Sequence, residues 1–327
     1  MKRTRHSIFL LSTSLFAAVL VSLIAGCKTK DSANRASETV SAYAKEFGAS
    51  AGRLTSKAGE KLGLVEKKWD FVRFAWDAQE KPAAVAHNYS YEDERDLGLA
   101  LALEFFARQE RFEHERLDPY LNLVASALAA HSDRPAMEVR VAVLRGESLH
   151  AFGLPGGLIL VPLGALRACE SESELAGLLA QAVAQCELRL TLARLEHFAA
   201  ERHAEAKEKS CVSLPPEQLR AVLEDLALDL SRNGLKAEDA RVADRRSVDL
   251  LMRLGYEPGG LRAHLARAQL KLREKAGGGP LANYAEFKAR EETIDARLAE
   301  LHAPSLGRSI ADRYRREGLV HLPAPKL

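Results

Sequence analysis

Residues 149–189, LHAFGLPGGLILVPLGALRACESESELAGLLAQAVAQCELR, constrain the fold of this chain more than any other stretch. Two short apolar segments, 149–152 and 158–161, predict two strands, and the Pro-Gly-Gly at 155–157 favours a turn between them. The polar residues 171–173 then provide the start of a helix, with acidic side chains where the positive end of the helix dipole would lie. The stretch therefore predicts a strand, a turn, a second strand and a long helix.

The long helix is apolar on nearly its whole circumference. Its larger apolar residues recur at three- and four-residue steps: Leu175, Leu178, Leu179, Val183 and Cys186. Alanine and glycine cover most of the remaining surface, which is typical of a buried central helix. Gln181 and Gln185 are four residues apart and share one face of it. A glutamine pair in such a helix is most simply a hydrogen-bonded pair in the core.

Several motifs in this region, in this order, resemble the HtpX/Oma-type (Ste-type) zinc metallopeptidases, a gluzincin family. The most specific are AFGLPGG at 151–157, ELAGLLA at 174–180, and Ala-Asp at 243–244 followed by GYEP at 255–258. The resemblance covers about residues 91–301. It implies an α+β fold: a mostly helical zincin-like peptidase domain with a small β-sheet and a buried central helix.

The residues that bind zinc in that family are absent here. In its HExxH motif, two histidines four residues apart bind zinc and the glutamate activates the bound water. Here Gln181 and Gln185 replace the histidines, Ala182 replaces the glutamate, and Ala240 stands at the third ligand position, four residues before Asp244. Amide oxygens are poor zinc ligands, and a zinc site is worth on the order of 10 kcal/mol. We therefore expect no catalytic residues, no bound metal and no cofactor.

Two further stretches contain candidate catalytic residues. The family's "HP…R" element should fall near residues 290–297, where Arg297 matches but no histidine or proline does. His197, Glu201 and His203 lie on the expected continuation of the central helix, where a charged, solvent-exposed helix end is the simpler interpretation. The sequence has no convincing GxSxG, Walker or GxGxxG motif, so a serine hydrolase is not supported.

The N-terminus has the pattern of a secretory signal. Basic residues at positions 2, 3 and 5 precede an apolar run, 8–25, that ends in small residues before Cys27. This ending resembles a bacterial lipobox, which predicts a signal peptide at 1–26 and lipidation, such as palmitoylation, of Cys27. Lys28, rather than aspartate, favours the outer membrane by analogy with enteric bacteria. The alternative is a transmembrane anchor, since the run is near the minimum length of a span.

Without residues 1–26, which carry three positive charges, the net charge falls from +2 to −1. A near-neutral exported chain gives no reason to expect nucleic acid as a partner. We expect a polar tether at 27–88 with possible amphipathic helices, a metallopeptidase-like domain at 89–304 and a C-terminal tail at 305–327.

Three cysteines remain besides Cys27. Cys169, Cys186 and Cys211 form no CxxC pair. One disulfide with a spare thiol and three buried thiols are both compatible with the sequence. The apolar neighbours of Cys169 and Cys186 favour buried thiols.

The function expected from these features is that of a pseudopeptidase: a lipid-anchored protein of the cell envelope, facing the periplasm. It would bind a polypeptide or envelope protein in a chaperone, adaptor or regulatory role. The residues expected to form the peptide-binding edge are Pro155, Gly156, Gly157, Leu158, Ile159 and Leu160. Three alternatives stand beside this hypothesis: the protein's own tail covers the edge, zinc is bound by unconventional ligands in an active metalloendopeptidase, or the protein is a purely structural lipoprotein.

Overall fold

The computed structural model describes residues 87–203, 210–275, 284–303 and 307–324, which all belong to one compact unit. The expected signal peptide, Cys27 and nearly all of the expected tether lie outside the described residues. Among the helices of the described ranges, none has the length and apolar character needed to cross a bilayer.

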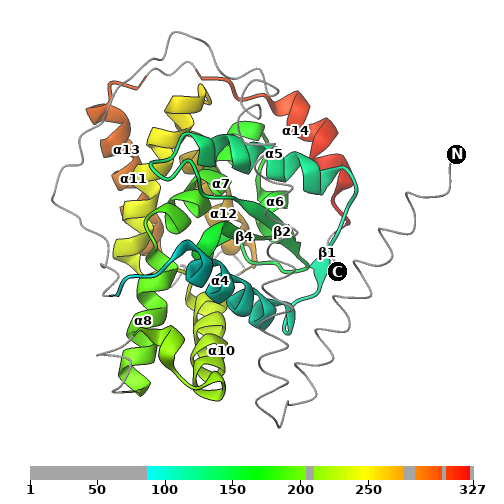
Figure 1. The fold of residues 1–327 in the computed structure, drawn as a ribbon. Helices are drawn as coiled ribbons and strands as arrows, with labels where there is room; N and C mark the ends of the chain where they lie inside the picture. The colour runs from blue at the N-terminus through cyan, green and yellow to red at the C-terminus, as the bar shows by residue number, and fades with distance from the viewer. Residues whose placement is uncertain (1–86, 204–209, 276–283, 304–306, 325–327) are drawn as a thin grey trace, which may run out of the picture. The chain divides into compact units, whose positions relative to one another are not determined.

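A small mixed sheet of four strands lies among the helices (Figure 1). The strands are β1 (Arg111–Phe112), β2 (Arg140–Leu144), β3 (Phe152–Gly153) and β4 (Leu158–Pro162), and their order in the sheet is β1-β2-β4-β3. β2 and β4 are parallel, whereas the two outer pairs are antiparallel. The fold is therefore α+β, with a predominance of helix.

The helices of the described ranges are α4 (Tyr91–Phe106), α5 (Leu117–Ala130), α6 (Leu163–Ala168), α7 (Glu172–Glu187), α8 (Leu190–Arg202), α10 (Pro216–Asn233), α11 (Ala237–Leu254), α12 (Gly260–Lys275), α13 (Tyr284–Glu300) and α14 (Ala311–Glu317). Short 3-10 turns are formed by Pro155–Gly157, Cys211–Ser213 and Leu319–His321.

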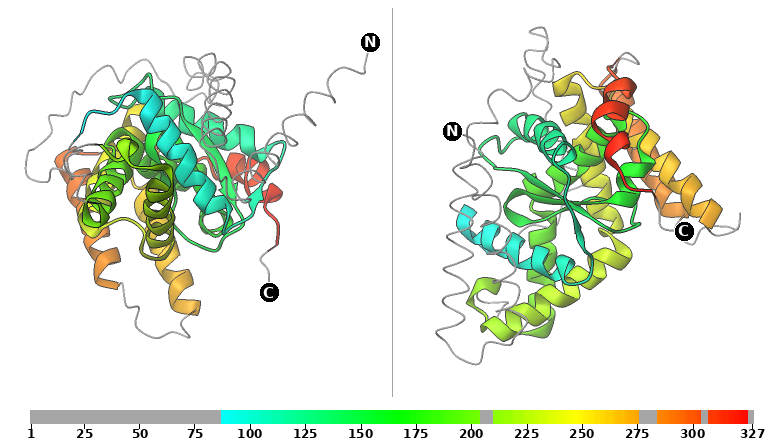
Figure 2. Two further views of the ribbon diagram at one scale, coloured as in Figure 1. Left: turned by 60° about the horizontal axis from the view of Figure 1, so that its bottom comes forward. Right: turned by 90° about the vertical axis from the view of Figure 1, so that its right-hand side faces the viewer.

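Helix α7 is the centre of the domain, as the sequence predicted. All its residues are buried, and α5, α11 and α12 pack against it (Figures 1 and 2). Ser171 caps its start by accepting a hydrogen bond from the amide of Glu174 over 3.2 Å. Because α7 is surrounded on all sides, polar side chains in its middle must find partners inside the protein.

The central helix ends earlier than expected. Arg189 adopts a left-handed conformation with φ of 56°, so α8 is a separate helix and not a continuation of α7. A left-handed residue ends a helix, and the Arg189 guanidinium forms an ion pair of 2.6 Å with Glu94. On α8, His197 and Glu201 are exposed and lie 3.2 Å apart. They form a solvated surface pair.

The strand expected to be an edge is an inner strand. Leu158, Ile159 and Leu160 lie in β4, whose main-chain groups pair with β2 on one side and β3 on the other. Pro155, Gly156 and Gly157 are buried too, and a Cβ on Gly156 would lie 2.4 Å from the Cα of Arg95 in α4. The expected peptide-binding edge is therefore wrong in position, because the chain folds back and β3 takes the edge itself.

The described tail residues, 307–324, pack beside α6 and the start of α7. Arg313 of α14 forms an ion pair with the fully buried carboxylate of Glu172. The hydroxyl of Tyr314 donates a hydrogen bond of 2.6 Å to the carbonyl oxygen of Leu166. These contacts place the described tail at the start of α7 and do not support the alternative in which the tail covers the edge strand.

Candidate functional site

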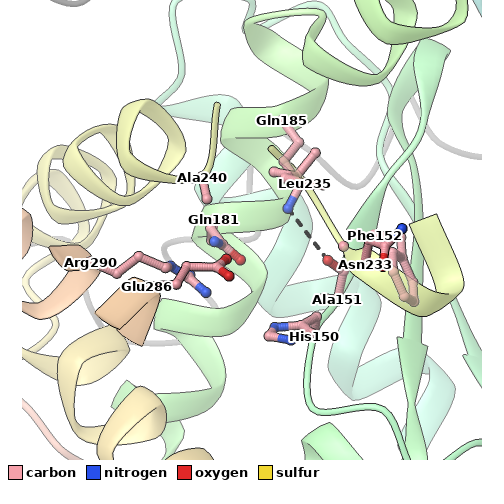
Figure 3. A pocket seen from close by; sticks show the side chains of 11 residues that line it. His150, Ala151, Phe152, Gln181, Gln185, Asn233, Leu235, Ala240, Glu286 and Arg290 are labelled. Carbon is pink, nitrogen blue, oxygen red and sulfur yellow. Dashed lines mark hydrogen bonds between the residues drawn. The ribbon is translucent and has the colours of Figure 1, made fainter. Parts of the chain in front are cut away.

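The two glutamines of α7, Gln181 and Gln185, line a pocket (Figure 3). The pocket is small, with a volume of about 20 Å³ for the centres of water-sized groups, and it opens to solvent. Its walls come from α7, the segment at the start of β3, the end of α10, the start of α11 and α13. Its lining residues are His150, Ala151, Phe152, Gln181, Gln185, Asn233, Gly234, Leu235, Ala240, Glu286 and Arg290.

Gln181 belongs to a buried ion-pair network. Its Nε2 donates a hydrogen bond of 2.9 Å to Oδ1 of Asp244, which is completely buried. Arg290 of α13 donates two hydrogen bonds to the same carboxylate, one from Nε to Oδ2 over 2.7 Å and one from Nη2 to Oδ1 over 2.8 Å. Burial by itself would lower the pKa of Arg290, but the charge and hydrogen bonds of Asp244 raise it above its ordinary value. The arginine therefore stays charged and neutralises Asp244.

Gln185 is bound to the main chain of the edge strand. Its Oε1 accepts a hydrogen bond of 2.8 Å from the amide of Gly153, and its Nε2 donates to the carbonyl of Ala151 over 3.4 Å. The hydroxyl of Thr191, at the start of α8, donates to the carbonyl of Gly153 over 2.6 Å. Phe152 pairs with Leu160 of β4, and its two neighbours direct their main-chain groups away from the sheet. Side chains of α7 and α8 therefore occupy the groups that an added strand would use.

Gly153 is required for this contact. A Cβ at this position would lie 2.2 Å from the main-chain oxygen of Ala182. The edge strand thus packs directly on α7, where Ala182 contributes only its backbone and a methyl group. Ala240 is also buried and brings no polar side chain to the pocket. Three of the four positions that the resemblance singles out, Gln181, Gln185 and Ala240, line the pocket, and Ala182 lies against the edge strand. None of the four carries an ionisable group.

His150 and Glu286 are the ionisable pocket residues that the sequence did not single out. Burial, together with the charge of Arg290 and the proximity of His264, lowers the pKa of His150 to about 3, so the imidazole is neutral. Glu286 lies on α13, one turn before Arg290. No cluster of three or more histidine, cysteine, aspartate or glutamate residues in the described ranges is placed to hold a metal ion. The pocket offers hydrogen-bond acceptors, among them the carboxylate of Glu286 and the imidazole of His150.

The arginine of the site is not the one that the resemblance indicated. Arg297 pairs with Asp249 through a contact of 2.9 Å, and Arg290 reaches the pocket instead. Seven residues make almost two helical turns, so the two positions share a face of α13. The helical spacing alone therefore does not distinguish Arg290 from Arg297.

The three cysteines of the described ranges are free and buried. Burial raises the pKa of Cys211 to about 11 and that of Cys186 to about 12, so both are protonated thiols at neutral pH. Cys169 lies 3.4 Å from Nδ1 of His264, and burial raises its pKa as well. Buried thiols of this kind pack as small apolar groups and are unreactive.

No protein-family model and no curated protein matches this chain.

Proposed function

We propose that this chain is a catalytically inactive, metallopeptidase-like protein that binds polypeptides in a chaperone, adaptor or regulatory role. One observation carries the first part of the proposal. At the two histidine positions of a zinc-binding helix stand glutamines that are engaged in structural hydrogen bonds, Gln181 with Asp244 and Gln185 with β3. A zinc ion would have to displace these bonds and would receive only neutral amides in return.

The general base and the third zinc ligand of a metallopeptidase also have no counterpart at the matching positions. Ala182 has no group that could take a proton from a bound water. Ala240 has no ligand atom, and the Asp244 carboxylate is held by Arg290. An active enzyme with unconventional ligands would have to rely on His150 and Glu286 alone, which is one protein ligand short of a typical catalytic zinc site. The pocket therefore favours binding over catalysis.

The closed edge limits how a polypeptide would be held. Strand addition needs free main-chain donors and acceptors, and those of Gly153 are occupied by Gln185 and Thr191. A bound polypeptide would instead insert a side chain or a terminus into the pocket. The closed edge also favours a second candidate function, that of a purely structural envelope lipoprotein. A pseudopeptidase would bind an unfolded polypeptide, whereas a structural lipoprotein would not.

The test uses the full-length protein, purified from membranes without chelator, and fluorescently labelled unfolded casein. Saturable binding at which the casein stays intact is the expected result, and a Glu286→Gln variant should bind more weakly than Glu292→Gln, which changes an exposed residue of the same helix. Absence of any saturable binding would favour the structural lipoprotein. Cleavage of the casein would contradict the proposal.

We also propose that Cys27 carries the lipid that anchors the protein in the bacterial envelope, facing the periplasm, with the outer membrane favoured. The amino-acid pattern before Cys27 supports this. Labelled palmitate fed to cells should be incorporated into the wild-type protein and not into Cys27→Ser. Equal labelling of the two proteins would favour a transmembrane anchor. So would retention of the Cys27→Ser protein in the membrane whether or not its N-terminal segment is cleaved.

A further inference from the structure

We propose that the pocket beside Gln181 binds a primary ammonium group, the chemistry shared by a lysine side chain and a polypeptide N-terminus. This inference rests on the proposed binding of polypeptides and names the group that would be recognised. It is carried by an excess of unused hydrogen-bond acceptors in the pocket, by its charge balance and by the closure of the edge strand.

The first acceptor is the amide oxygen of Gln181. This side chain is only 5% exposed. Its nitrogen must face the carboxylate of Asp244, because an oxygen there would be repelled, and so its Oε1 is turned towards the pocket (Figure 3). Within the described ranges, Oε1 has no hydrogen-bond donor. Because the pocket opens to solvent, water can donate to Oε1 in the free protein, and a ligand that donates to it would take the place of that water.

Two further acceptors point into the same space from other walls. Glu286 brings a carboxylate from α13, next to the amide of Gln181, and the imidazole of His150 approaches from the opposite wall (Figure 3). No hydrogen bond or ion pair holds either side chain to another described residue. Because burial and Arg290 keep His150 neutral, with a pKa of about 3, a ring nitrogen remains available as an acceptor. An ammonium group has three donors in a compact arrangement, which matches three converging acceptors.

The charges in the pocket favour a cation. Arg290 and Asp244 neutralise each other through two hydrogen bonds. The carboxylate of Glu286 is then the remaining charge in the interior of the pocket. Arg232 also borders this space, but it is exposed at the end of α10, where solvent and salt screen its charge. Glu286 also interacts electrostatically with Arg290, whose pKa it helps to raise, so one arginine faces two carboxylates. A bound ammonium would balance the remaining negative charge.

The closed edge indicates why the ligand would be a side chain or a terminus. Gln185 and Thr191 prevent an extended segment from pairing with β3. The pocket has a volume of about 20 Å³ for the centres of water-sized groups, which is room for a single ammonium group at the tip of a side chain or at the end of a chain. Recognition would then depend on one charged group at a time, which suits a protein that binds many unfolded polypeptides.

The first experiment measures the affinity of the full-length protein for methylammonium, from the rise in its melting temperature with concentration at constant ionic strength. We expect a saturable rise with methylammonium and none with tetramethylammonium, which has the same charge and no N–H donor. Glu286→Gln should weaken the binding at least about tenfold, whereas Glu292→Gln should leave it unchanged. Equal effects of the two cations, or of the two variants, would overturn the inference.

The second experiment separates the two sources of the ammonium group and separates this inference from the proposed function. Its probes are unstructured peptides with a free or acetylated N-terminus and with lysine or acetyl-lysine. Loss of binding on acetylation of one amine identifies that amine as the ligand. Binding that survives acetylation of both would overturn the ammonium inference but leave polypeptide binding intact. Binding of methylammonium without binding of any peptide would overturn the polypeptide function and support the pocket.

Discussion

The side chain of Gln185 holds the main chain of Gly153, because its Oε1 accepts the Gly153 amide over 2.8 Å. Gln185 stands where the resemblance would place a zinc-binding histidine. It brings a neutral amide to that position, and it closes the neighbouring edge strand. If the chain descends from a metallopeptidase, loss of the metal and loss of the strand-addition surface are the same change.

Replacing Gln185 by leucine should loosen the edge strand. Two hydrogen bonds to β3 would be lost and two main-chain groups left unsatisfied, which should lower the free energy of unfolding by about 1–3 kcal/mol. Gln269→Leu, a change on the less buried surface of α12, is the matched control and should stay within about 0.5 kcal/mol. Urea unfolding measures both, and hydrogen exchange should show faster exchange of the Gly153 amide only in the first variant. Unchanged exchange at Gly153 would contradict the closed edge.

Breaking the pair between Asp244 and Arg290 should be far more damaging than breaking a surface pair. Asp244→Asn leaves a buried guanidinium without its counter-ion, which should cost roughly 3–5 kcal/mol. The exposed pair of Arg262 and Asp295 is the control, and Asp295→Asn should cost less than about 1 kcal/mol. A double replacement of Asp244 and Arg290 by leucine and methionine should recover part of the loss. Equal costs at the two sites would mean that the network around Gln181 is not a structural one.

Acidification should destabilise the protein through His264. This residue is 1% exposed, and burial lowers its pKa to about 4, against an ordinary value of 6.5. The unfolded chain therefore binds a proton first, so the contribution of His264 to stability is complete above pH 6.5 and is lost as the pH falls towards 4. The loss is on the order of 3 kcal/mol.

The measurement for this prediction is urea unfolding between pH 4.5 and 7. His264→Gln should show a flatter dependence of the unfolding free energy on pH than wild type. His197→Gln, which changes an exposed histidine of α8, should keep the wild-type slope. The same slope in His264→Gln and wild type would show that His264 is not held neutral by its surroundings.

Restoring the missing ligands tests the resemblance itself. A triple variant, Gln181→His, Gln185→His and Ala240→Glu, places two imidazoles on α7 and a carboxylate on α11 around one pocket. If the frame is that of a gluzincin, the variant should bind about one zinc ion and melt at a higher temperature with zinc than without it. A variant with only Ala240→Glu should not bind zinc. Failure of a folded triple variant to bind zinc would count against the zincin-like geometry.

Local patterns were sufficient to predict the elements that depend on local chemistry. The apolar residues around α7 and the serine at its start predicted a buried, capped helix. The end of α7 was missed because it depends on Arg189, which has no glycine-like preference for a left-handed conformation and is held by Glu94 from a distant helix.

The order of the strands and the partners of the glutamines are non-local, and the sequence did not predict them. Nothing in residues 149–161 indicates that a two-residue strand, β3, takes the edge from β4. The pairing of Asp244 with Arg290 joins residues 46 positions apart. Arg297 satisfies the same helical spacing, so only the three-dimensional contacts could identify Arg290. Gln181, Gln185 and Ala240, which the motif comparison singles out, do line one pocket.

The central claim is that the pocket beside Gln181 and Gln185 holds no zinc and is not catalytic, and metal content tests it most directly. Elemental analysis of the full-length protein, purified without chelator, should give far less than one zinc ion per chain, and the same preparation should leave unfolded casein intact. One zinc ion per chain, with cleavage of casein that a chelator abolishes, would contradict the account and require ligands other than Gln181, Gln185 and Ala240.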